Sequence, residues 1–164
     1  MSTRAEIMSY ILANPGVYLR ELSEDLGLAM GVVQYHVWVL RRDGLVEEYR
    51  SGRYRRFFGA AEYQEMEQKV ISLLRQQTAG RILTILLEGQ PINHTRLAAV
   101  LGVTSQALTW QMRRLGTMGI VEKSRIQNHS GVSYRLVDSI SQRVQATARL
   151  LKSGPDLVQV PSFR

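Results

Sequence analysis

The chain matches itself without a gap when it is shifted by 75 residues. Most matched positions are apolar residues and glycines, which are the residues that build a core and its turns. The identical pairs include Ile7/Ile82, Leu12/Leu87, Leu22/Leu97, Leu26/Leu101, Gly27/Gly102, Leu40/Leu115, Gly44/Gly119, Val46/Val121 and Glu47/Glu122. Because 164 residues leave room for two small modules and their connectors, the repeat predicts two copies of one fold.

Both copies predict the same order of elements. Each opens with an amphipathic helix, and in the first copy its apolar residues are Ile7, Met8, Ile11 and Leu12. A short second helix then ends at a glycine, where a left-handed residue turns the chain. We expect third helices over 30–43 and 105–118, then hairpins with strands at 45–50 and 54–59 and at 120–126 and 132–137. Helix, helix, turn, helix, hairpin is the order of a winged helix-turn-helix.

Two further helices lie outside the repeat. The first spans 62–77, with Tyr63, Met66, Val70 and Leu73 or Leu74 on one stripe. The second begins at Ser139, which forms a capping box with Gln142, and ends at Gly154-Pro155. Its apolar face consists of Ile140, Val144, Thr147 and Leu151.

These patterns predict a mainly α chain with small β-hairpins, of the α+β class. Two tandem winged helix-turn-helix modules are joined by a helix and followed by a C-terminal helix. The predicted boundaries are 1–60 for the first module, 61–79 for the linker helix, 80–138 for the second module and 139–164 for the C-terminal helix and tail. The start of each third helix differs, since Thr104 is a good N-cap and Ala29 is a poor one.

The composition and motifs of the chain exclude several classes of function. The absence of cysteine excludes disulfides, thiolate metal sites and cysteine nucleophiles. His36, His94 and His129 lack the spacing of a metal site, and no nucleophile elbow, phosphate loop or paired acid motif is present, so we expect no metal, no cofactor and no catalysis. No apolar run approaches the roughly 20 residues that span a bilayer. We therefore expect a cytoplasmic, nucleoid-associated protein with no membrane contact.

The segment LRELSEDLGLAMGVVQYHVWVLRRDGLVEEYRSGRYRRFF resembles the winged helix-turn-helix transcription regulators of the ArsR/MarR-like kind. The pairing of two modules in one short chain is similar to archaeal tandem winged-helix regulators. The resemblance covers residues 5–59 and 80–137 and implies a DNA-binding regulator of transcription. Metal sensing does not carry over, because that function needs cysteine or clustered histidine and carboxylate ligands.

The third helices are the candidate readers of DNA, since a helix of this size fits the major groove. After the core positions are subtracted, the first copy presents Met30, Gly31, Gln34, Tyr35, Trp38 and Arg41 outward. The second presents Ser105, Gln106, Thr109, Trp110 and Arg113. Glutamine pairs with adenine, arginine pairs with guanine or phosphate, and the aromatic rings lie against the sugar-phosphate wall.

The hairpins are the candidate phosphate contacts. Lysine and arginine outnumber aspartate and glutamate by 21 to 14, and 18 of the 21 are arginine, whose planar fork suits phosphate. The first hairpin carries Arg50, Arg53, Arg55 and Arg56, and the second carries Lys123, Arg125, His129 and Arg135. Alternation along a two-stranded ribbon limits how many of these point one way, so we expect two or three contacts from each wing.

The residues predict a sequence-specific regulator that binds double-stranded DNA as a homodimer, and they indicate no particular effector. A solvated polar face is the alternative interpretation of the third helices. A protein-interaction adaptor is the alternative function, favoured by the outward apolar positions expected for Val32, Trp38 and Val39. The two extra helices either pack within the chain or form a dimer interface. RNA binding is disfavoured, because the aromatic sheet motifs that bind unstacked bases are missing.

Overall fold

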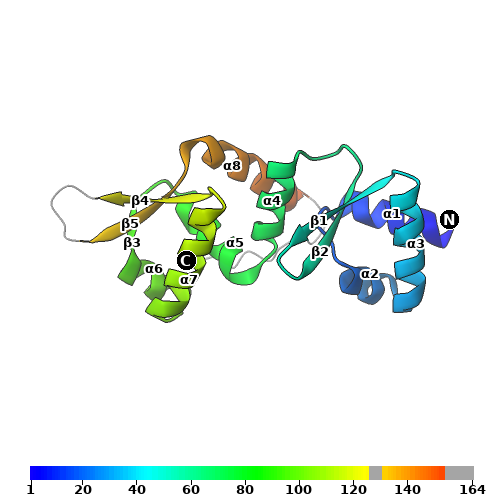
Figure 1. The fold of residues 1–164 in the computed structure, drawn as a ribbon, viewed down its shortest axis with the longest axis horizontal. Coiled ribbons are helices and arrows are strands. Elements are labelled where there is room, and N and C mark those ends of the chain that lie inside the picture. Colours follow the sequence, from blue (N-terminus) through cyan, green and yellow to red (C-terminus); the bar gives the residue numbers. More distant parts are fainter. Residues whose placement is uncertain (126–130, 154–164) are drawn as a thin grey trace. The chain divides into compact units, whose positions relative to one another are not determined.

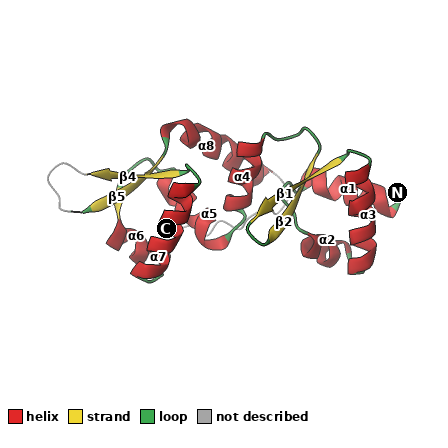
Figure 2. Cartoon of the chain, viewed as in Figure 1, coloured by secondary structure: helices red, strands yellow, loops and turns green. Residues whose placement is uncertain are grey.

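The computed structural model describes residues 1–125 and 131–153. Helices dominate and the strands form small antiparallel sheets, so the predicted fold class is confirmed (Figures 1 and 2). The chain divides into two compact units, whose described parts are residues 1–72 with 150–153 and residues 73–125 with 131–149. No helix in the described part of the chain is long and apolar enough to cross a membrane.

The first module follows the predicted order. Its elements are α1 (Thr3–Ala13), α2 (Leu19–Leu26), α3 (Met30–Arg42), β1 (Val46–Ser51) and β2 (Tyr54–Gly59). Ile7, Leu22 and Val33 meet in one core and are fully buried. The predicted apolar face of α1 is wrong at its end, because Leu12 stays 47% exposed.

The first hairpin is buried on both faces at its base. Antiparallel register pairs Glu48 with Phe57 and Glu47 with Phe58, so the two phenylalanines point to opposite sides of the ribbon. Phe57 joins the core of α1, α2 and α3, while Phe58 meets the ring of Tyr63 at 5.8 Å between centroids. Both phenylalanine side chains are within 1% of complete burial.

The second module repeats this plan. Its elements are α5 (Gln77–Leu86), β3 (Ile92–Asn93), α6 (His94–Leu101), α7 (Ser105–Thr117), β4 (Val121–Arg125) and β5 (Val132–Leu136). The strand β3 was not predicted, since two residues carry no periodicity. It pairs with β5 and gives the sheet order β3-β5-β4. The first module has only the single bridge between Val17 and Phe57 at the corresponding edge.

The helices outside the repeat are α4 (Glu65–Leu74) and α8 (Asp138–Ser153). The linker helix is therefore shorter at both ends than the predicted 62–77. The predicted capping role of Ser139 is wrong, because α8 already begins at Asp138 and the amides of Ile140 and Ser141 bond to Val137 O. The predicted apolar face of α8 is confirmed, while Gly154-Pro155 lies outside the described residues. That face consists of Ile140, Val144, Thr147 and Leu151, all buried.

The two third helices begin differently, as predicted. Thr104 Oγ1 accepts a hydrogen bond from the Ala107 amide at 3.1 Å and so satisfies one of the free amides at the start of α7. Ala29 makes no side-chain cap at the start of α3. The glycines that precede both helices adopt the left-handed conformation, with φ of 63° at Gly27 and 68° at Gly102.

Candidate nucleic-acid interface

The helix α7 presents the predicted polar row to solvent. It buries Leu108, Met112 and Leu115 against the second module, which leaves the opposite side of the helix free. All the residues predicted on that side are exposed: Ser105, Gln106, Thr109, Trp110 and Arg113. Amide, hydroxyl and guanidinium groups therefore lie along one exposed face of a helix whose first turn is capped.

His94 contacts the first residue of α7, although the sequence did not predict it as a site residue. His94 Nδ1 lies 2.8 Å from the Tyr134 hydroxyl, and its Nε2 lies 3.2 Å from Ser105 O and 3.0 Å from Ser105 Oγ. Both ring nitrogens of His94 are therefore within hydrogen-bond distance of partners on other elements. Burial raises the pKa of Tyr134. The contact joins α6, α7 and β5, so no local sequence signal reveals it.

The outer face of α3 is also exposed, but its chemistry is more apolar. Every predicted residue there is accessible: Met30, Gly31, Gln34, Tyr35, Trp38 and Arg41. Tyr35 and Trp38 are 56% and 55% exposed. The expectation that Val39 points outward is wrong, because Val39 is 2% exposed, whereas Val32 is 40% exposed. Val39 is buried, as is its neighbour Leu40.

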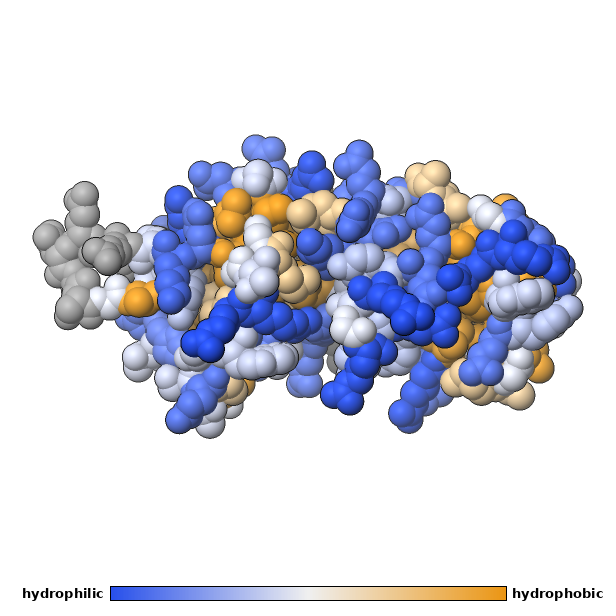
Figure 3. Space-filling view, viewed as in Figure 1, coloured by the Kyte–Doolittle hydropathy of each residue, from blue (hydrophilic) through white to orange (hydrophobic). Residues whose placement is uncertain are grey.

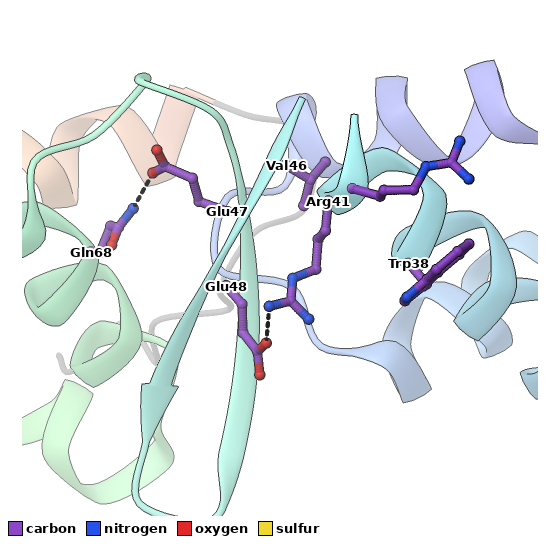
Figure 4. Close-up of a pocket in the computed structure, with 7 residues that line it drawn as sticks. Trp38, Arg41, Val46, Glu47, Glu48 and Gln68 are labelled. Atoms are coloured by element: carbon purple, nitrogen blue, oxygen red, sulfur yellow. Dashed lines mark hydrogen bonds and ion pairs between the residues drawn. The ribbon is translucent and has the colours of Figure 1, made fainter. Parts of the chain in front are cut away.

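A groove of about 600 Å³ runs beside the last turns of α3 (Figure 4). It is lined by Trp38, Arg41, Arg42, Val46, Glu47, Glu48 and Gln68. The guanidinium of Arg42 lies 5.1 Å from the centre of the Trp38 ring, a cation–π contact. Figure 4 shows Glu47 and Glu48 pointing apart, Glu47 toward Gln68 of α4 and Glu48 toward Arg41 of α3.

The first wing exposes Arg50, Arg53 and Arg55, as predicted, but not Arg56. Arg56 is 3% exposed, donates from Nη1 to Gly16 O at 2.9 Å and lies 5.5 Å from the centre of the Tyr18 ring. The prediction of a DNA contact at Arg56 is therefore wrong. Arg55 and Arg56 point to opposite faces of β2, and residues 16–18 cover Arg56.

Three arginines of the first module converge on one carboxylate. Glu48 forms ion pairs with Arg41 at 2.7 Å and Arg50 at 3.5 Å, and Arg55 donates to it from both Nε and Nη2. The hydrogen bond from Arg55 lowers the pKa of Glu48, burial opposes this shift, and the nearby arginine charges lower the pKa further. The carboxylate therefore stays ionised and holds all three guanidinium groups.

The second wing is arranged differently. Lys123 is exposed, while Arg135 pairs with Glu122 across the strands at 2.6 Å and lies 3.9 Å from Asp138. The predicted contacts of the Arg125 side chain and of His129 fall outside what the structure describes. Within the described residues, no cluster of three or more His, Cys, Asp or Glu side chains is placed to hold a metal ion.

Two family models match the chain, one for each module. A model described as an N-terminal HTH domain matches residues 1–71, and one described as winged helix-turn-helix DNA-binding matches residues 75–122. The chain therefore carries two helix-turn-helix modules in tandem, each with the hairpin of a winged helix. The resemblance to winged helix-turn-helix transcription regulators is thus confirmed. Figure 3 shows hydrophilic side chains over much of the visible surface of each module.

The chain is similar to one curated protein and to several solved structures, each over part of its length. An uncharacterized HTH-type transcriptional regulator of Methanocaldococcus jannaschii is 28% identical over 138 residues, which are 84% of this chain and 34% of that protein. The chain thus spans about a third of that relative's length. Wild-type apo MarR from E. coli is 26% identical with a TM-score of 0.43, over 56% of this chain and 68% of MarR. The antimony-specific transcriptional repressor AntR is 28% identical with a TM-score of 0.42, over 52% and 76%.

Proposed function

We propose that the chain regulates transcription by binding double-stranded DNA in a sequence-specific way. The observation that carries this proposal is the exposed row on α7, where Gln106 and Arg113 lie on one face behind a capped helix start. A helix of this kind fits the major groove with its first turns against the base edges. Bidentate pairing of glutamine with adenine and of arginine with guanine supplies the discrimination between sequences.

The wings supply the part of the affinity that does not depend on sequence. Arg50, Arg53 and Lys123 are exposed cations on the hairpins, and the whole chain carries a net charge of +7. Cations that replace condensed counterions on the phosphates make the binding strongly dependent on salt. We assign base reading to the third helices and phosphate binding to the wings.

The proposed regulator is a non-enzymatic cytoplasmic homodimer, associated with the nucleoid through its DNA contacts. A dimer matches the two-fold symmetry of operators that helix-turn-helix proteins commonly read. We retain the boundaries 1–60, 61–79, 80–138 and 139–164 as its functional segments. Sedimentation of the protein with and without a selected duplex tests the dimer, since one chain per duplex would contradict it.

The test of DNA binding is a titration of random duplex over a salt series, read by fluorescence anisotropy. Arg53→Ala is expected to weaken binding to all sequences alike and to reduce the log–log salt slope by about 0.9. Arg4→Ala is the matched control, because Arg4 is an exposed arginine of the same module on α1, which carries no predicted contact. Equal effects of the two variants would mean that the first wing does not touch the phosphates.

One observation favours a second candidate function, that of a protein-interaction adaptor. The outer face of α3 exposes four apolar or aromatic side chains, those of Met30, Val32, Tyr35 and Trp38, among its polar residues. Such apolar surface on a soluble module commonly marks a protein contact. If the wild-type chain shows no salt-dependent affinity for duplex DNA, the adaptor replaces the regulator as the proposed function.

A further inference from the structure

We propose that Glu48 acts as an electrostatic brake on DNA binding by the first module. The inference rests on the proposed function and concerns how strongly the first module engages the phosphates. Glu48 forms ion pairs with three arginines of the candidate DNA-binding surface. A DNA phosphate that binds these arginines therefore either displaces the carboxylate or lies close to its negative charge. The brake lowers the affinity of the first module for duplexes of any sequence.

The geometry places the carboxylate beneath its partners. Arg50 and Arg55 lie on the same face of the hairpin as Glu48, and Arg41 reaches it from α3. The Glu48 side chain is 7% exposed, whereas those of Arg41, Arg50 and Arg55 are 37%, 74% and 45% exposed. The arginines therefore form the outer layer, and water and salt screen the inner carboxylate poorly.

The repeat offers an internal comparison at the same positions. With the shift of 75 residues, Arg41 matches Gly116 and Glu48 matches Lys123, while Glu47 matches Glu122. The second module therefore carries an exposed cation where the first carries the buried carboxylate. The fold does not require a carboxylate at this position, because the second module forms the same hairpin with lysine there.

The charges set the direction of the effect. Each arginine that binds a phosphate adds about 0.9 to the log–log salt slope, provided that it displaces a counterion. An arginine already paired with Glu48 is partly neutralised, and the buried charge repels the phosphate that approaches it. Removal of the Glu48 charge should therefore raise both the affinity and the salt slope. A purely structural role for Glu48 would leave the slope unchanged.

The test compares Glu48→Gln with Glu47→Gln on random duplex over a salt series. Both variants remove one negative charge from neighbouring residues of β1, but Glu47 faces away and accepts from Gln68 at 3.1 Å. Glu48→Gln is expected to bind on the order of tenfold more tightly at low salt, with a steeper slope. Glu47→Gln is expected to stay near wild type.

The outcomes separate the brake from the proposed function. Salt-dependent binding by the wild type together with equal behaviour of the two variants overturns the brake and leaves the regulator in place. Weaker binding by Glu48→Gln also overturns the brake, since it would mean that Glu48 holds the arginines ready for phosphate. Absence of binding by the wild type and by Glu48→Gln overturns both proposals.

A second comparison leaves Glu48 unchanged, so it still tests the brake if the Glu48→Gln variant fails to fold. Arg55→Ala removes an arginine that Glu48 holds, and Arg53→Ala removes an exposed arginine from the turn of the same wing. The brake predicts that Arg53→Ala weakens duplex binding more than Arg55→Ala does. Equal losses, or a larger loss from Arg55→Ala, would overturn it. Thermal unfolding of each variant shows whether the fold is retained.

Discussion

The third helices of the two modules share a backbone plan but present different surfaces. At matched positions both carry an aromatic residue, Tyr35 in α3 and Trp110 in α7. The other outward positions change character, since Trp38 of α3 matches Arg113 of α7. The face of α7 is therefore able to hydrogen-bond to base edges along its length, while the face of α3 mixes apolar groups with an arginine held by Glu48.

This difference shows that the fold does not determine which side chains occupy the outward positions of the third helix. The repeat keeps some buried positions identical, such as Leu22 with Leu97 and Leu40 with Leu115, all within 2% of complete burial, and keeps others apolar. Packing against other elements constrains these side chains in size and shape. The outward side chains meet solvent and are free to diverge, so one fold can offer two binding chemistries in a single chain.

The largest expected effect tests whether α7 is the reader of sequence. Gln106→Ala with Arg113→Ala should erode discrimination between a selected site and random duplex more than Gln34→Ala with Arg41→Ala. Each bidentate base contact that is lost costs about 1–3 kcal/mol of discrimination. Both double variants are titrated on both duplexes at one salt concentration. A loss of specificity in the α3 variant alone would make the first module the reader and the second a scaffold.

The next effect concerns the edge of each hairpin. In the second module β3 pairs with β5, whereas in the first the Arg56 side chain bonds to Gly16 O beside the single bridge of Val17. Arg56→Ala should therefore lower the free energy of unfolding of the first module by about 1.5–3 kcal/mol, because it removes a buried charged hydrogen bond. Chemical denaturation measures the loss.

The salt slope of duplex binding provides the control for Arg56. It should stay at the wild-type value in the folded Arg56→Ala variant, because this side chain is buried beneath residues 16–18. A slope reduced as much as in Arg53→Ala would instead place Arg56 on the phosphates, as the sequence first suggested.

The smallest effect exchanges the starts of the two third helices. Thr104→Ala should destabilise the second module by about 1 kcal/mol, because the Ala107 amide loses its partner. Ala29→Thr should stabilise the first module by a smaller amount, since Ala29 already has the extended backbone of an N-cap, with φ of −61° and ψ of 142°. Amide hydrogen exchange in the first turns of α3 and α7 measures both changes. An unaltered exchange rate at Ala107 would contradict the capping role.

The sequence by itself determined the tandem fold, the order of elements and the outward rows of the third helices. These features depend on periodicity within one segment, such as the burial of Leu108 and Met112 on one side of α7. They also depend on local backbone chemistry, such as the capping of α7 by Thr104. A pattern that is repeated 75 residues later reinforces both kinds of signal, because the same core has to form twice.

Only the tertiary structure decided which arginine and lysine side chains are exposed and therefore available to bind DNA. Arg55 and Arg56 are neighbours in sequence, yet one lies on the surface with Glu48 and the other is covered by residues 16–18. His94 contacts Ser105 at the start of α7 through one ring nitrogen and Tyr134 of β5 through the other. Each of these contacts joins elements that are distant along the chain, so charge and spacing in the sequence do not specify them. The ion pairs of an arginine depend on the side chains that pack beside it, and these come from elements that meet only in the tertiary structure.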